Sequence, residues 1–399
     1  MRKLANTLYV TSPEAYLSKE GENVVVSIKG EKDHRLPIHN LESIVCFGYQ
    51  GASPQLMALC AERGVALSFL SEHGRFLCRV IGSDRGNILL RKKQYRASDD
   101  EAASGRLARS FVIGKLVNCR YVLRRFRRDH AERCTEGFLQ ALEQLEELIG
   151  IIKQEENPTV ATVRGWEGNG ARVYFSAFGE LILVDHDVFA FRGRNKRPPL
   201  DAVNALLSWT YTLLMHDVQS ALETVGLDVQ AGFLHRDRPG RSSLALDLME
   251  ELRPYLADRF VLTLINDRIV GPGDFYRKEN GAVLLEPDSR KKILKRWQER
   301  KKDTITHDIF DEKMEIGLLP YAQAMLLART IRGDLSLYPP KPRLAANVCV
   351  RSPRPAKITG CGCRTPFSNV SLIPCSCKCS KPVSTRSSIP NKTACAITT

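Results

Sequence analysis

The spacing of apolar residues changes near Arg85, and this change constrains the fold more than any other feature of the sequence. Before that point, short apolar runs alternate with turn residues, a pattern typical of β-strands. The expected strands cover residues 7–10, 24–28, 44–47, 65–70 and 76–81. After Arg85, apolar residues recur every three or four positions as far as about Leu337, which predicts helices. We therefore expect an α+β protein, with a small N-terminal β-rich domain over residues 1–85 and a larger, mostly α-helical domain over residues 86–340.

One helix should interrupt the strands of the first domain. Ser53 is suited to accept a hydrogen bond as an N-cap, and Pro54 is suited to the first helical position. Gly64 can adopt the left-handed conformation that ends many helices. These local signals predict a helix from Pro54 to just before Gly64.

Residues 341–399 differ from the rest of the chain. They hold ten Lys and Arg residues, no Asp or Glu, and seven of the twelve cysteines. Residues 1–340 therefore carry 49 basic against 45 acidic residues and are only mildly basic. The segments CGC and CSCKC could bind zinc, but structural zinc sites favour wider cysteine spacing. We expect an unstructured or non-native C-terminal tail, with a zinc module as the alternative.

The other cysteines and the hydropathy indicate the compartment. Cys46, Cys60, Cys78, Cys119 and Cys134 have no paired spacing, which is typical of reduced thiols. The sequence contains no apolar run of about 18 residues, the length that a membrane helix needs. We expect a soluble cytoplasmic protein that does not associate with a membrane.

The segment from His235 to Pro254 holds the strongest candidate for chemistry. Asp247 and Glu250 are three residues apart in an expected helix, so both carboxylates should project from one face. His235 precedes this helix across a Pro-Gly turn and could complete a mixed nitrogen and oxygen site for Mg²⁺ or Mn²⁺. The alternative is a solvated helix face without a ligand.

Glu167 is the second candidate and lies among glycines, in RGWEGNGARVYF. Glycine on both sides would let a backbone or a phosphate approach closely, and a helix is expected over residues 171–178. The segment lacks the Lys-Ser/Thr ending of a nucleotide-binding P-loop, so a nucleotide triphosphate site is not indicated. Glu167 could also be an acid that a helix N-terminus stabilises.

Asp185, His186 and Asp187 form a rival cluster. If this run is extended, His186 faces away from both aspartates, and the three cannot bind one ion. We expect them to make local hydrogen bonds.

Basic residues gather in three places: Arg120 to Arg128 on one expected helix, Arg192 to Arg197, and Arg290 to Lys302 around Trp297. Each cluster alone could be a solvated surface. In a nearly neutral body, they together favour a local surface for DNA phosphates.

Four segments, in this order along the chain, resemble the CRISPR-associated spacer integrase, or adaptation endonuclease, most closely its subtype I-C form. They are GASPQLMALCAERGVALSFLSEHGRFLCRV, the GWEG segment, FRGRNKRPPLDAVNALLSWTYTLL and AGFLHRDRPGRSSLALDLMEELRP. The resemblance covers about residues 1–340 and leaves residues 341–399 unmatched. It implies an N-terminal β-rich dimerisation domain joined to an α-helical catalytic domain.

The resemblance also implies site residues. The family's metal ligands match Glu167, His235 and Glu250, and the nearby acid Asp247 would support or share the site. Many relatives carry Asp where this chain has Glu250, whose side chain is longer by one methylene. DNA contacts are expected from Arg194, Lys196, Arg197 and Arg241.

The function that this resemblance implies is a metal-dependent DNA endonuclease and integrase of CRISPR adaptation. The enzyme would insert captured foreign DNA fragments into the CRISPR repeat array, by attack of a 3′ hydroxyl on a phosphodiester. Its expected partners are double-stranded DNA, a second copy of the chain and a small ferredoxin-like CRISPR adaptation protein. The alternatives are a general repair nuclease for branched DNA and a catalytically inactive DNA-binding scaffold.

Overall fold

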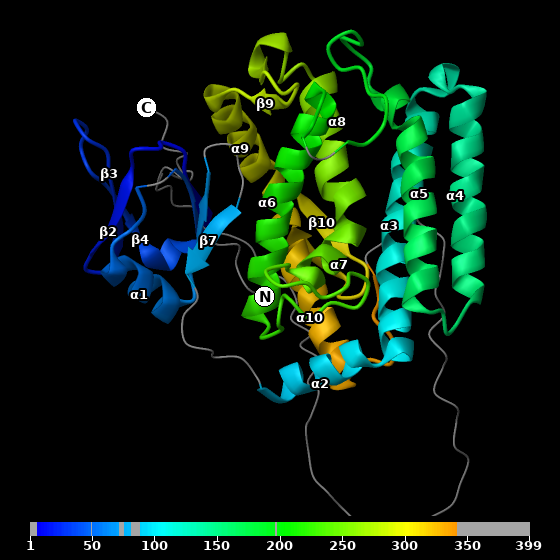
Figure 1. The fold of residues 1–399 in the computed structure, drawn as a ribbon, viewed down its shortest axis with the longest axis horizontal. Coiled ribbons are helices and arrows are strands. Elements are labelled where there is room, and N and C mark those ends of the chain that lie inside the picture. The colour runs from blue at the N-terminus through cyan, green and yellow to red at the C-terminus, as the bar shows by residue number, and fades with distance from the viewer. Residues whose placement is uncertain (1–5, 49, 72–75, 81–87, 196–197, 341–399) are drawn as a thin grey trace, which may run out of the picture. The chain divides into compact units, whose positions relative to one another are not determined.

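The computed structural model describes residues 6–48, 50–71, 76–80, 88–195 and 198–340. Figure 1 labels its helices and strands. The expectations for the C-terminal tail and for Lys196 and Arg197 lie outside the described residues. No helix among the described residues combines the length and the apolar character that a membrane crossing requires.

The N-terminal part contains two small sheets. The order of the four-stranded sheet is β1-β5-β6-β7, and that of the antiparallel three-stranded sheet is β2-β3-β4. The strands are β1 Asn6–Val10, β2 Tyr16–Glu20, β3 Asn23–Ser27, β4 His34–Pro37, β5 Leu41–Phe47, β6 Ala66–Leu70 and β7 Phe76–Val80. The five expected strands are confirmed, but β2 and β4 were not predicted. The reason is that β2 buries only Leu17 and β4 buries no side chain fully, so neither shows an apolar run.

The helix α1, Pro54–Arg63, connects the parallel strands β5 and β6. The Ser53 hydroxyl accepts a hydrogen bond from the Leu56 N–H at 3.2 Å, and Gly64 ends the helix with a φ of 70°. The predicted caps of this helix are therefore confirmed.

The rest of the described chain is mostly helical, as expected. Its helices are α2 Ile88–Asp99, α3 Glu101–Asp129, α4 Glu136–Gln154, α5 Val160–Phe178, α6 Ala202–Thr224, α7 Ser243–Leu252, α8 Arg259–Asn266, α9 Pro287–Lys301 and α10 Leu319–Arg332. A π-helix, Arg253–Asp258, joins α7 to α8. It contains Pro254, which lacks the N–H that a regular helix needs and so accounts for the change of register.

Two departures from the expected helical part concern its irregular segments. The short hairpins β8 Phe275–Arg277 with β9 Val283–Leu285, and β10 Thr304–His307 with β11 Glu312–Glu315, were not predicted. The expectation of a separate helix over residues 171–178 was wrong, because α5 is continuous through the glycines around Glu167.

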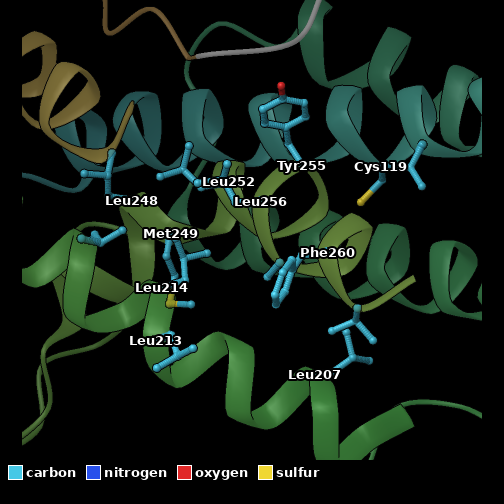
Figure 2. Close-up of a cluster of buried hydrophobic side chains, with 14 of the residues drawn as sticks. Cys119, Leu207, Leu213, Leu214, Leu248, Met249, Leu252, Tyr255, Leu256 and Phe260 are labelled. Atoms are coloured by element: carbon cyan, nitrogen blue, oxygen red, sulfur yellow. The ribbon is translucent and has the colours of Figure 1, made fainter. Parts of the chain in front are cut away.

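The helical core surrounds α7. Leu244, Leu248 and Leu252 are buried, as the spacing predicted. Figure 2 shows Leu248 and Leu252 between the helices that carry Cys119 and Leu214, namely α3 and α6. This apolar face anchors α7, so the carboxylates of Asp247 and Glu250 lie on a rigid element.

Two glycines let α3 approach its neighbours closely. A Cβ atom on Gly114 of α3 would lie 2.9 Å from the Glu251 Cβ of α7, and one on Gly170 of α5 would lie 2.2 Å from a methyl of Leu116. Figure 1 also shows α3 running alongside α5. Since Lys115 lies between Gly114 and Leu116 in the sequence, these contacts bring its side chain close to both α5 and α7.

The close contact at Gly114 gives a stability prediction. Gly114→Ala should lower the free energy of unfolding by about 1–3 kcal/mol, because the new methyl overlaps Glu251 and Pro340. Urea unfolding followed by circular dichroism measures this loss. Gly150→Ala in α4 is the matched control, because a Cβ there meets nothing within 4 Å and should stabilise the helix by about 0.5–1 kcal/mol. Equal changes in the two variants would contradict the packing argument.

Candidate active site

Two acidic side chains from different helices meet at one lysine. Glu167 lies within α5, and Glu250 lies near the end of α7. The ammonium of Lys115, from α3, lies 2.7 Å from Glu250 Oε2 and also donates to Glu167 Oε1. Glu250 and Lys115 are buried, whereas the Glu167 side chain is 28% exposed. The two expected acids therefore converge, and they do so around a cation that the sequence analysis did not include.

Glu250 has a second cationic partner. Arg253, one turn further along, places its Nη1 2.6 Å from Glu250 Oε1. Burial by itself would raise the pKa of the Glu250 carboxyl, but Arg253, Lys115 and His235 together hold this pKa below its ordinary value. Burial would likewise lower the pKa of Lys115, yet the carboxylates of Glu250 and Glu167 raise it above its ordinary value. The carboxylate of Glu250 and the ammonium of Lys115 therefore each favour the charged form of the other.

Asp247 fixes the third expected residue, His235. Its carboxylate lies 2.6 Å from His235 Nδ1 and accepts the backbone N–H groups of Phe233, Leu234 and His235 at 2.6, 2.9 and 2.9 Å. The Asp247 side chain is fully buried. These four contacts engage both of its oxygens, which favours a role in positioning the imidazole over one in sharing a metal ion. The alternative of a solvated helix face is wrong for both Asp247 and Glu250.

The donor chemistry of the cluster fits a divalent metal ion. Glu167 and Glu250 direct oxygens at one cation, and His235 is held by Asp247, which lies one turn before Glu250 on α7. Because Nδ1 of His235 is engaged with a carboxylate, Nε2 is the nitrogen available for ligation, an arrangement common to metal-binding histidines. Among the described residues, however, no three His, Cys, Asp or Glu side chains are grouped closely enough to hold an ion, and Lys115 stands between the acids.

The rival cluster at Asp185 to Asp187 is a turn, so its run is not extended. Asp185 has a φ of 48°, and its carbonyl accepts the N–H groups of Val188 and Phe189 at 3.0 and 2.9 Å. All three polar side chains are exposed. The bonding here is local, as expected.

The expected DNA-binding residues have different environments. The Arg194 guanidinium donates to Asn204 Oδ1 at 2.6 Å and to Ser208 Oγ at 3.1 Å, and it lies 5.3 Å from the centre of the Tyr211 ring. These contacts hold the segment before α6 in place. They also engage both Nη atoms of the Arg194 guanidinium, which a phosphate would otherwise bind. Arg241, by contrast, lines a cavity beside the acidic cluster.

This cavity has a volume of about 650 Å³ and lies between α6, α7 and β9. Its wall combines the aromatic side chains of Trp209 and Tyr211 with the cationic side chains of Arg241, Arg253 and Arg290. Because Arg253 also pairs with Glu250, the cavity adjoins the candidate site. Cationic side chains beside the carboxylates of Glu167 and Glu250 are suited to bind an anionic substrate whose reacting group must reach those carboxylates.

A comparison with family models matches residues 8–299 to the family described as CRISPR associated protein Cas1. The chain belongs to the Cas1 family. A curated relative, CRISPR-associated endonuclease Cas1 1 from Chlorobaculum tepidum, is 51% identical over 341 residues, which span 85% of this chain and 99% of that protein. The prediction of a CRISPR-associated endonuclease and integrase is confirmed at the level of the family.

Solved structures share the fold. A casposase bound to integration product aligns with a TM-score of 0.72 and 22% identity, over 85% of this chain and 94% of that one. A Cas6-RT-Cas1–Cas2 complex aligns with a TM-score of 0.74 and 21% identity, over 86% of this chain and 37% of that one. The prediction of a β-rich part followed by a helical part is confirmed, and these solved structures share that fold.

Two residues that pair with Glu250, Lys115 and Arg253, were not predicted from the sequence. Arg253 follows Glu250 at a spacing that allows side-chain contact on a helix, so its role had a visible signal. Lys115 had a weaker one, since it is a single charge within the apolar segment FVIGKLVNC.

Proposed function

We propose that this Cas1 protein is a divalent-metal-dependent DNA integrase whose reaction depends on Glu167, His235 and Glu250. It would insert captured DNA fragments into a CRISPR repeat array and would also cut DNA when water replaces the attacking hydroxyl. The observation that carries the proposal is the convergence of Glu167 and Glu250 on one cation, with His235 fixed by a buried carboxylate nearby.

The roles of the residues follow from their contacts. Glu167 and Glu250 would hold the ion through their oxygens, and His235 would add Nε2. Arg253 bonds the other oxygen of Glu250 and keeps this carboxylate oriented, while Asp247 does the same for the imidazole. When bound, Mg²⁺ or Mn²⁺ would polarise the scissile phosphodiester and stabilise the charge that develops on it.

The strand-transfer step conserves the number of phosphodiester bonds. The 3′ hydroxyl of the fragment loses its proton to water and forms a new bond to phosphorus. The bond from phosphorus to the 3′ oxygen of the repeat strand breaks, and that oxygen takes up a proton from water. Arg241 and Arg290 line the adjoining cavity and would hold the DNA backbone by their charge. Correct positioning of two DNAs would then supply much of the rate.

The partners and the subtype are part of the proposal. We expect a homodimer through the β-rich domain, residues 1–85, and a complex with a small ferredoxin-like CRISPR adaptation protein. The shared fold with part of a chain in a Cas6-RT-Cas1–Cas2 complex supports such a partner. The segments quoted above favour subtype I-C. Since the substrate is genomic DNA, we expect the protein to act in the cytoplasm.

The test is strand transfer of a fragment with free 3′ hydroxyls into a plasmid that carries a CRISPR repeat, with the small partner present. Transfer should stop in EDTA, return with Mg²⁺ or Mn²⁺, and favour the repeat over random DNA. Transfer that persists in EDTA would contradict the metal requirement. Preference for branched DNA over the repeat would instead support a repair nuclease.

A further inference from the structure

Lys115 makes an unusual pair of contacts for a buried lysine. It extends from α3, which also buries Val112, Leu116 and Val117, and its side chain is only 7% exposed. Buried lysines need compensation, because removing an ammonium from water is costly. Lys115 obtains it from two carboxylates at once, one on α5 and one on α7.

Lys115 engages one oxygen of each acid. Glu250 Oε1 lies 2.6 Å from Arg253 Nη1, whereas Glu250 Oε2 lies 2.7 Å from the Lys115 ammonium. The same ammonium bonds Glu167 Oε1. An ion bridging the two acids from within this space must therefore take the position of the ammonium.

We propose that Lys115 is a built-in counterion that holds Glu167 and Glu250 together in the metal-free protein and that a divalent ion must displace from them. The inference rests on the proposed function, because it takes these acids as the metal ligands. The lysine keeps two acids close in a low-dielectric site where they would otherwise repel each other. It also weakens metal binding, because the ion has to compete with a tethered cation.

The inference predicts that removal of the lysine strengthens metal binding. Lys115→Met should bind Mn²⁺ about tenfold more tightly than the unaltered protein or better, since the ion no longer displaces a cation. Isothermal titration calorimetry, or the electron paramagnetic resonance signal of free Mn²⁺, measures the affinity. The rise in melting temperature on adding Mn²⁺ should also be larger in the variant than in the unaltered protein.

Lys301→Met is the matched control. Lys301 is equally buried, at 8% exposure, and pairs with Asp217 at 2.8 Å on other helices. This variant loses a buried ion pair of the same kind, so it should lose stability but keep the original Mn²⁺ affinity. Lys115→Gln, which keeps polarity without charge, decides the question if Lys115→Met does not fold.

Each outcome is decisive. Unchanged or weaker Mn²⁺ binding in a folded Lys115 variant overturns the counterion role and leaves the metal site intact. Variants that fold only with Mn²⁺ support it, whereas variants that fold under neither condition make Lys115 a core residue and overturn it. If neither the unaltered protein nor the Lys115 variants bind Mn²⁺ above the level of His235→Ala, the metal site fails as well.

Discussion

His235→Ala is expected to lower the rate of strand transfer by a factor on the order of 100 to 1,000, because the site loses its only proposed nitrogen ligand. The fold should be retained, since the His235 side chain is partly exposed at 23% and its backbone N–H can still bond Asp247. Single-turnover strand transfer at saturating DNA measures the effect. Mn²⁺ titration should show weaker binding in parallel.

His186→Ala is the control for this variant. His186 is exposed and belongs to the turn at Asp185, so its removal should change neither transfer nor Mn²⁺ binding. A normal rate in a folded His235→Ala protein would remove His235 from the proposed site. A similar loss in both variants would point to a general effect on the protein.

Asp247→Asn is expected to lower strand transfer roughly 10- to 100-fold without removing a ligand. The amide cannot accept all the donors that the carboxylate now holds, and its own N–H₂ would face one of them. The imidazole then loses its fixed tautomer, and buried N–H groups of residues 233–235 lose a partner. The free energy of unfolding should fall by about 1–3 kcal/mol.

Asp217→Asn is the control that separates the positioning of His235 by Asp247 from a general loss of stability. Asp217 is also poorly exposed, at 14%, and accepts Lys301 at 2.8 Å. We expect it to lose stability but to keep Mn²⁺ affinity and the pH profile of transfer. If Asp247→Asn altered stability alone in the same way, the positioning role would be refuted.

The sequence predicted those parts of the fold that depend on local signals. The α1 helix begins at Ser53 and ends at Gly64 because capping is decided within a few residues. The glycines around Glu167 led to a wrong prediction, that the helix would begin only at residue 171. Each glycine disfavours a helix by only about 1 kcal/mol. Burial of Val163, Val173 and other apolar side chains of α5 outweighs that cost.

Spacing alone indicated His235, Asp247 and Glu250 as candidates for one site. The resemblance joined Glu167 to these residues, and the convergence of Glu167 and Glu250 on Lys115 depends on tertiary packing. Lys115 contacts residues 52 positions away at Glu167 and still further away at Glu250, so no local pattern joins them. The glycine contacts of α3 that bring them together are likewise visible only in the fold.

The short helix α7 has a consequence for how the protein loses activity. It carries Glu250, it anchors the His235 loop through Asp247, and it leads directly into Arg253. A transient local unfolding of these ten residues would break several site contacts at the same time. A molecule in which α7 is unfolded should therefore have no activity, rather than reduced activity. Slow hydrogen exchange at the α7 amides should therefore accompany catalytic competence, and the onset of fast exchange on warming should coincide with its loss.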